Sequence, residues 1–341
     1  MRRRRKPDRR RRLRATRWAT AHRRRLVAVA IGLLVLAVAY LRPGFDDGGE
    51  PPPTRRTDVD APDPAVLAAD DSYWLFSTSA DGHRLPIRGA TVFGVWGGST
   101  EGLARRPGWA AQNEVWGPSV IEADGRYVLW FASPTGVTVH SMSIGPAVSD
   151  TPGGPYEPLG DEPAICSPSG AAIDPHPWRS SDGRLFLAWT QYHIESGGSD
   201  IRAAALDESG TELAGQPRRL LAGREGWEDA VLENPAMFED DGSIRLLYSG
   251  NRWYTADYAT GTATCERPLG PCRRDTPRSP WHAGGRRLNG PGGMELFTDH
   301  AGETWAVFHA WDDRVGYPAG GRRAPHVVPL SDLPPLPPPQ G

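Results

Sequence analysis

Cysteines and metal-binding patterns are scarce in this sequence. Its 341 residues include only three cysteines, and no Cys-x-x-Cys pair or histidine-rich cluster indicates a zinc or haem site. Positive charge is also scarce after residue 25, because residues 1–25 hold 14 of the 39 basic residues and only one of the 41 acidic residues. Residues 26–341 therefore carry a net charge of −15, which argues against a nucleic-acid partner.

Charged residues are absent from segment 26–41, a run of 16 mostly apolar residues directly after the basic run. Basic residues before an apolar helix stay on the cytoplasmic side of a membrane, so the chain after residue 41 is expected outside the cytoplasm. A helix of this length spans roughly 24 Å, slightly less than a hydrocarbon core, and Ala37-Val38-Ala39 suits signal peptidase. A single-pass anchor and a cleaved signal both remain open. Either one predicts an extracytoplasmic protein, membrane-anchored or secreted.

The rest of the chain divides by composition. Residues 42–57 are rich in glycine and proline, which is typical of a linker, and residues 331–341 form a proline-rich tail that is expected to be extended. Residues 1–25 are expected to be a short basic cytoplasmic segment. Residues 58–330 are then long enough for one large domain with a core of its own.

Two of the cysteines, Cys265 and Cys272, flank a short turn-rich loop. A loop of this length can bring two cysteines into disulfide range, and disulfides persist in the oxidising compartment that the N-terminal segments predict. Two reduced thiols are the alternative. Cys166 is left over from this pairing.

Amphipathic helices are not evident outside segment 26–41, whereas turn residues and aromatics are abundant, with 40 Gly, 34 Pro and 13 Trp. This composition favours an all-β fold. A five-fold repeat supports it, in which a proline corner is followed by an apolar run, a turn and a second β-rich run. The five corners lie 54 to 60 residues apart, at Asp63-Pro64, Gly117-Pro118, Asp174-Pro175, Asn234-Pro235 and Gly290-Pro291.

The turns of the repeat predict hairpins. Three of them are Asp-Gly pairs between short apolar runs, which is a strong hairpin signal. Five hairpins at a regular period, each with room for further strands, predict a five-bladed β-propeller of four-stranded blades. A β-sandwich is the alternative, but it leaves the recurring proline corner unexplained. The expected fold is thus an all-β propeller, preceded by one N-terminal membrane-spanning or signal helix.

Three corners carry a carboxylate: Asp63 and Asp174 lie directly before a proline, and Glu233 lies two residues before one. Because proline restricts the residue before it, Asn234 is expected to be extended and the backbone at Glu233 stiff. Equivalent points of different blades converge at one end of a propeller channel. Three carboxylates there cannot all ionise as they would in water, and an acid with a raised pKa beside an ionised base is what glycoside hydrolysis needs. A solvated turn residue is the alternative for each acid alone.

With these motifs the sequence resembles glycoside hydrolase family 43, whose members are five-bladed propellers that cleave arabinose- and xylose-containing glycans with inversion. The resemblance spans about residues 58–330 and rests on the order and spacing of its motifs together. These motifs are Asp63-Pro64, Leu85-Pro86-Ile87, Trp116-Gly117-Pro118-Ser119-Val120, Ile173-Asp174-Pro175, Trp227-Glu228-Asp229, Glu233-Asn234-Pro235, the run 258–265, Gly290-Pro291-Gly292-Gly293 and Phe308-His309-Ala310-Trp311.

The resemblance implies a role for each acid. Asp63 would be the general base that takes a proton from the attacking water, and Glu233 the general acid that protonates the leaving oxygen. Asp174 would hold Glu233 in place and keep its proton affinity high. The implied substrate is an arabinose- or xylose-containing oligosaccharide or polysaccharide, and no cofactor is required for the reaction.

The resemblance also implies roles for residues around the acids. Trp116 would stack on a sugar ring, with core packing as the alternative, and Arg323 would be a pocket arginine, with Arg322 an equally good candidate. His309 matches a histidine on the channel axis that contacts a structural calcium ion or an ordered water. A buried histidine bonded to the backbone is the alternative. Gly117 and Ser119 depart from the family pattern in motif 116–120. These departures are expected to alter the edge of the pocket without changing the three acids.

Two other functions remain open beside an inverting glycosidase that acts on arabinofuranosyl or xylosyl linkages. One is a propeller without activity that binds glycan or a protein at the cell surface. The other is a related five-bladed propeller that acts on fructosyl linkages with retention. The presence of all three acids favours an enzyme over a binding module.

Overall fold

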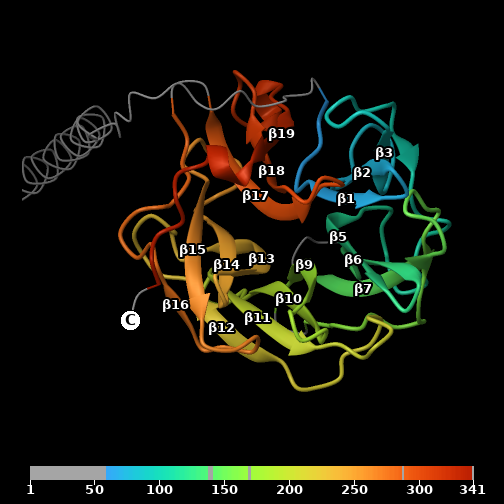
Figure 1. The fold of residues 1–341 in the computed structure, drawn as a ribbon, viewed down its shortest axis with the longest axis horizontal. Helices are drawn as coiled ribbons and strands as arrows, with labels where there is room; N and C mark the ends of the chain where they lie inside the picture. The colour runs from blue at the N-terminus through green and yellow to red at the C-terminus, as the bar shows by residue number, and fades with distance from the viewer. Residues whose placement is uncertain (1–58, 137–140, 168–169, 286–287, 340–341) are drawn as a thin grey trace, which may run out of the picture. The chain divides into compact units, whose positions relative to one another are not determined.

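The computed structural model describes residues 59–136, 141–167, 170–285 and 288–339. These residues form five antiparallel sheets, of which four have four strands and one has three. In each sheet the strands are ordered as they follow in the chain. The sheets are arranged as blades around a common centre (Figure 1), so the predicted all-β, five-bladed propeller is confirmed.

The blades follow one another along the chain, and the first strand of each lies nearest the centre in Figure 1. Blades one and two comprise β1 (Ala65–Ala69), β2 (Ser72–Phe76), β3 (Pro86–Ala90) and β4 (Thr100–Glu101), then β5 (Trp116–Ala123), β6 (Arg126–Pro134), β7 (Met142–Ser149) and β8 (Glu157–Pro158). Blades three and four comprise β9 (Ala172–Arg179), β10 (Leu185–Tyr192), β11 (Ser199–Ala205) and β12 (Arg218–Ala222), then β13 (Leu232–Asp240), β14 (Ser243–Gly250), β15 (Ala259–Cys265) and β16 (Cys272–Arg274). Blade five comprises β17 (Asn289–Thr298), β18 (Thr304–Trp311) and β19 (Arg323–Pro329), with the short 3-10 helices η1 (Tyr317–Ala319) and η2 (Leu330–Asp332).

Tight turns join the first two strands of the blades. Asp124 and Gly125 between β5 and β6 have φ angles of 49° and 69°, and Asp241 and Gly242 between β13 and β14 have 47° and 74°. Two successive residues with positive φ match the two-residue hairpin turn whose twist suits the flanking strands. These two Asp-Gly pairs therefore form the hairpin turns that the sequence predicts, whereas Asp182-Gly183 lies in a longer turn between β9 and β10, where only Gly183 of the pair has a positive φ.

The five proline corners share a backbone conformation that differs from the expected one. Asn234 is not extended: its φ is 46°, in the left-handed region. The residue before the proline has a φ between 46° and 59° at all five corners, namely Asp63, Gly117, Asp174, Asn234 and Gly290. The strand registers of β5, β9, β13 and β17 shift at this point, so each of these corners is a β-bulge. A bulge turns the side chain of its extra residue out of the ladder, which overrides the usual preference before proline.

The hydrophobic core is divided among the seams between blades. Five clusters of buried side chains occur, and each contains residues of two neighbouring blades. Trp130 of β6 and Trp189 of β10 are almost fully buried in the cluster between blades two and three. Burying a large apolar side chain stabilises a fold by about 1.5–3 kcal/mol, so each seam holds its two blades in a fixed relation. This fixed relation also positions the inner strands around the centre.

The two ends of the described chain contact the propeller. The N–H of Ala61 donates to the carbonyl of Arg323 at 3.0 Å, which places the first described residues beside β19. In the proline-rich tail, the Pro337 carbonyl accepts a hydrogen bond of 2.7 Å from Arg245. The predicted apolar segment 26–41 lies outside the described residues. Within the ranges that the structure describes, no helix has the length and apolar character needed to cross a membrane.

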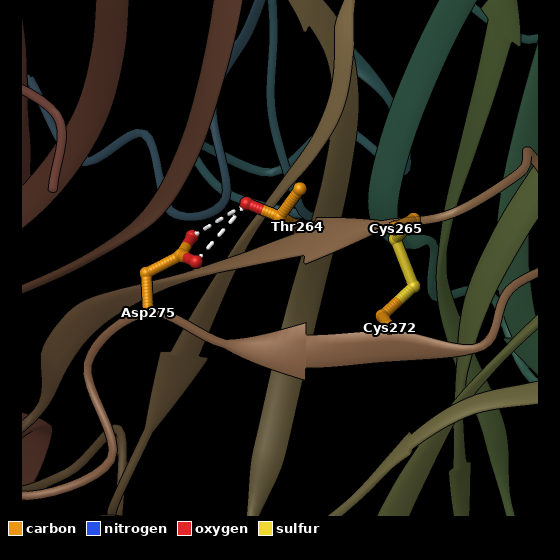
Figure 2. Close-up of a disulfide and its surroundings, with 4 residues drawn as sticks. All are labelled: Thr264, Cys265, Cys272 and Asp275. Carbon is orange, nitrogen blue, oxygen red and sulfur yellow. Dashed lines mark hydrogen bonds between the residues drawn. A yellow bond between two sulfur atoms is a disulfide. The ribbon is translucent and has the colours of Figure 1, made fainter. Parts of the chain in front are cut away.

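Cys265 and Cys272 form a disulfide that joins β15 to β16 (Figure 2). The two residues are direct partners in the strand register, and their Cα atoms are 3.9 Å apart. Just beyond the other end of β16, Asp275 accepts hydrogen bonds of 3.0 and 3.1 Å from the Thr264 hydroxyl of β15. The short strand β16 is thus fastened to β15 at both ends. Cys166 is exposed and has a free thiol.

Candidate active site

Residues from the proline corners line one small cavity at the propeller centre. Asp63, Asp174 and Asn234 contribute to it from three blades, together with Gly117 and Gly293. Side chains are packed closely here: a Cβ on Gly117 would lie 2.6 Å from Oδ1 of Asp174, closer than non-bonded atoms approach. Only glycine fits at this corner, which also has a positive φ. The corners therefore converge as expected, and the glycine leaves room for the carboxylate of Asp174.

Asp63 is held as an anion. Its Oδ2 accepts a 2.7 Å hydrogen bond from the Thr78 hydroxyl, and Nη1 of Arg323 lies 3.4 Å from both carboxylate oxygens. The Asn234 amide donates to Oδ1 at 3.4 Å. Burial alone would raise the pKa of Asp63, but the Arg323 charge and these hydrogen bonds outweigh burial and lower it. An ionised carboxylate that is 15% exposed can act as a base toward water.

Arg323, at the start of β19, is the arginine that reaches the acids. Its guanidinium lies 4.7 Å from the ring centroid of Trp253 and 5.7 Å from that of Tyr317. Cation–π contact of this kind fixes a guanidinium and adds about 0.5–2 kcal/mol where it is desolvated. Arg322 instead pairs with Asp312 at 3.4 Å. Of the two predicted candidates, Arg323 is therefore the one placed beside Asp63.

Glu233 lies between two tyrosine hydroxyls. Tyr192, the last residue of β10, donates to Oε1 at 2.5 Å, and Tyr258, directly before β15, lies 2.8 Å from Oε2. The side chain is nearly inaccessible, with the residue 6% exposed. Burial raises the pKa of Glu233 above its usual value, and the Asp63 charge adds to this, whereas hydrogen bonds from the two hydroxyls oppose it. Glu233 is thus the carboxyl that retains a proton where Asp63 does not.

Asp174 lies close enough to Glu233 for the charges of their carboxylates to interact. Its Oδ2 accepts the N–H of Asn234 at 3.0 Å. Burial raises the pKa of Asp174 well above the usual value, and the charges of Glu233 and Asp63 raise it further. An ionised Glu233 therefore disfavours ionisation of Asp174.

Tyr258 links the two acids through Asn234. Its hydroxyl lies 2.8 Å from Oε2 of Glu233 and 2.7 Å from Oδ1 of Asn234. A hydroxyl has a single proton to donate, so it cannot donate to both oxygens at once. If Glu233 is protonated, it donates to Tyr258, which donates to Asn234, whose Nδ2 donates to Asp63. With Glu233 ionised, the hydroxyl instead donates to Oε2 of Glu233, and this hydrogen bond lowers the pKa of Glu233.

His309, on β18, lies behind Asp63 and is fully buried. Burial and the Arg323 charge lower its pKa to about 3, so the ring is neutral. The Asp63 N–H donates to Nδ1 at 3.1 Å, which leaves the ring proton on Nε2. Nε2 is buried and has no hydrogen-bond partner among the described side chains and backbone groups.

The predicted calcium ion does not fit this histidine. A nitrogen that carries a proton is a donor, which suits an ordered water, whereas calcium binds oxygen ligands. In the part of the chain that the structure describes, no group of three or more His, Cys, Asp and Glu side chains is placed to hold a metal ion.

Trp116, the other predicted substrate contact, begins β5 and is half-buried. It packs against the cluster between blades two and three, and its Nε1 donates to Glu114 at 3.3 Å. The neighbouring residue Gly117 reaches the site instead, because its N–H donates to Thr78 Oγ1 at 2.9 Å. Stacking of Trp116 on a sugar ring stays a prediction, with core packing as its alternative.

Four residues that touch the acids were not predicted as site residues, namely Thr78, Tyr192, Asn234 and Tyr258. Asn234 had a signal, since it occupies the corner position that Asp63 and Asp174 occupy in other blades. Thr78 follows β2 and Tyr192 ends β10, and both are second strands of their blades. The spacing of the proline corners marks only the first strand of each blade, so it does not predict which residues of the second strand reach the site. Tyr258 begins the run 258–265, one of the motifs that resemble family 43. The sequence does not indicate which residues its hydroxyl contacts, and only the structure shows them.

Comparison with known proteins identifies relatives across most of the chain. A family model described as Glycosyl hydrolases family 43 matches residues 57–326. A search of curated proteins finds no match.

Solved structures with the same fold include a thermostable family-43 glycoside hydrolase, with a TM-score of 0.69 and 23% identity, which covers 84% of this chain and 98% of that one. An endo-1,4-beta-xylanase from Bacteroides thetaiotaomicron has a TM-score of 0.68 and 20% identity, with 81% and 92% covered. An alpha-L-arabinofuranosidase from Lactobacillus brevis has a TM-score of 0.65 and 19% identity, with 81% and 90% covered.

Proposed function

The chain belongs to family 43 of the glycosyl hydrolases, and we propose that it is an inverting glycosidase that cleaves arabinofuranosyl or xylosyl linkages. The observation that carries the proposal is the pair of partly buried Asp63 and buried Glu233, whose surroundings shift their pKa values in opposite directions. Two carboxyls whose pKa values are shifted in opposite directions can supply the base and the acid of glycoside hydrolysis. Neighbours described as a xylanase and an arabinofuranosidase favour pentose-containing glycans.

The proposed reaction is a single displacement. Asp63 takes a proton from a water, whose oxygen attacks the anomeric carbon while the glycosidic C–O bond breaks on the opposite side. Glu233 gives its proton to the leaving oxygen. Asp174 positions Glu233 through the N–H of Asn234, and its own charge, when present, disfavours ionisation of Glu233.

The hydroxyl of Tyr258 connects the acid to the base through Asn234. A protonated Glu233 turns the Tyr258 hydroxyl toward Asn234, and Asn234 then supports the ionised form of Asp63. Tyr258 is a positioning residue in this scheme, because it contacts both the acid and the amide that bonds the base.

Replacing Tyr258 with Phe is expected to shift both limbs of the pH profile of kcat/KM. Losing a donor to ionised Glu233 raises the pKa of the acid further, so the alkaline limb moves to higher pH. Losing the support through Asn234 raises the pKa of Asp63, so the acidic limb also moves to higher pH. The matched control is Tyr192→Phe, which removes a hydroxyl from Glu233 alone. An acidic limb that moves equally in both variants would contradict the proposed link.

The pH profile of the unaltered protein is expected to be bell-shaped. Asp63 must be ionised, and its pKa lies below the ordinary 3.8, so activity rises as pH increases through that low value. Glu233 must be protonated, and its pKa lies above the ordinary 4.5, so activity falls as pH increases through that raised value. Rates measured on a nitrophenyl glycoside between pH 3 and 9 test this. A profile that still rises above pH 6 would contradict it.

The N-terminal segments lead us to propose an extracytoplasmic location, by an anchor or a cleaved signal at residues 26–41. The substrate would then be a polysaccharide or oligosaccharide met outside the cytoplasm. Immunodetection in membrane and culture-medium fractions separates these two forms, and recovery in the cytoplasm alone would contradict both.

The direct test of the proposed function is an assay of the purified protein on nitrophenyl arabinofuranoside, nitrophenyl xyloside and arabinan. Release of nitrophenol or sugar by the unaltered protein, and loss of sugar release from arabinan in Glu233→Gln, is the expected result. Binding of these glycans without release of any product would support the non-catalytic alternative.

A further inference from the structure

A second hollow lies away from the catalytic acids, on the outer side of the propeller. It is a groove of about 640 Å³ between residues 219–224 on one side and residues 272–274 with Pro277 on the other. These residues belong to β12 and β16, the outermost strands of blades three and four. The two strands contact each other and lie side by side in Figure 1.

The lining of the groove is basic. It contains four arginines and no acidic residue. Arg274 is neutralised by Glu228, with contacts of 2.5 and 2.7 Å. Arg273 has only Glu266 at 3.9 Å, in a pair in which both side chains are more than half exposed, and such pairs contribute little.

The other two arginines of the lining are Arg219 and Arg224. Both are exposed, and neither guanidinium forms an ion pair with any described residue. The groove therefore presents three weakly compensated positive charges, those of Arg219, Arg224 and Arg273. By contrast, residues 26–341 as a whole carry a net charge of −15. A basic groove on an acidic domain attracts anions locally.

The walls of the groove are held in place before any ligand binds. The disulfide and the Thr264–Asp275 hydrogen bonds fasten both ends of β16 (Figure 2). Arg274 donates to the carbonyl of Ala222 in β12, which ties the two walls together. Rigid walls reduce the entropy that is lost on binding.

The chemistry of the lining selects the type of ligand. Arginine forks bind carboxylate and phosphate oxygens in pairs, so the ligand carries repeated oxyanions. The lining contains no aromatic residue, and it therefore offers nothing on which nucleic-acid bases stack or on which the apolar face of a neutral sugar packs.

We propose that this groove binds an acidic polysaccharide through the carboxylates of its uronic acid residues. The choice of a glycan rests on the proposed glycosidase function. The groove would hold acidic stretches of a mixed polymer while neutral pentose linkages reach the acids at the propeller centre. Polymer binding at a separate site raises the effective concentration of cleavable linkages.

Hydrogen exchange of the full chain, followed by mass spectrometry, tests this inference residue by residue. This resolution separates the groove from the basic segment 1–25, which also attracts anions. The probe is polygalacturonate, and the expected result is slower exchange in 218–224 and 272–274. Arg219→Glu combined with Arg273→Glu should weaken this protection at least about tenfold in polymer concentration. The matched control, Arg105→Glu with Arg126→Glu, makes the same charge change at two exposed ion pairs outside the groove and should keep it.

Several outcomes would overturn the inference. These are equal protection by neutral dextran, equal loss in the control variant, and protection by polyphosphate or anionic lipid vesicles without protection by polygalacturonate. The groove variant should also hydrolyse nitrophenyl arabinofuranoside at an unchanged rate. Groove protection in a protein that releases no sugar would support the binding site while the proposed function fails. Sugar release without groove protection would reject the site and leave the proposed function standing.

Discussion

Glu233→Gln is expected to lower kcat for a natural pentoside by at least about 10²-fold, because glutamine cannot give a proton to the leaving oxygen. Glutamine has nearly the same size, and its amide can keep hydrogen bonds with the hydroxyls of Tyr192 and Tyr258. The fold should therefore persist, and near-ultraviolet circular dichroism checks this. Steady-state rates on an arabinan or xylan oligosaccharide give the measurement.

The leaving group provides the control for this role. A dinitrophenyl glycoside releases a stable anion that needs no proton, so Glu233→Gln should lose less than about tenfold on it. An equal loss on both substrates would mean that Glu233 does not act as the general acid.

Asp63→Asn is expected to lower kcat by about 10²- to 10⁴-fold, since an amide cannot take a proton from water. Asparagine tolerates the left-handed backbone at this corner, where φ is 50°, and its side-chain oxygen can still accept from Thr78. Folding should thus be preserved. Rates are compared with the unaltered protein on the same two substrates.

The two variants should differ in how they respond to the leaving group. A better leaving group does not replace the activation of water, so the deficit of Asp63→Asn should persist on the dinitrophenyl glycoside. Recovery of Asp63→Asn on that substrate, to the level of Glu233→Gln, would contradict the assignment of Asp63 as the base.

The five blades could be predicted from sequence because one local feature repeats along the chain. A proline corner before an apolar run, followed by a hairpin turn, marks the start of each inner strand. Inner strands converge in a propeller, so Asp63, Asp174 and Glu233 could be placed together from their positions alone. The same reasoning could not reach residues 26–41, which lie outside the described residues and stay a prediction.

The conformation of the corners and the hydroxyls around Glu233 were not predicted. Proline usually makes the preceding residue extended, but the bulge places Asn234 in the left-handed region. A signal was present, since all five corner residues are Asp, Asn or Gly, the types that tolerate positive φ. Tyr192 and Tyr258 reach Glu233 from the ends of other strands, and strand period does not specify where such side chains point.

Proton NMR of the sugar first released from an arabinofuranoside tests the central claim most directly. Asp63 and Glu233 acting on opposite sides of the scissile bond, with a water beside the base, predict a first product of inverted anomeric configuration. A first product of retained configuration would contradict this account, because it requires a carboxylate to attack the sugar directly.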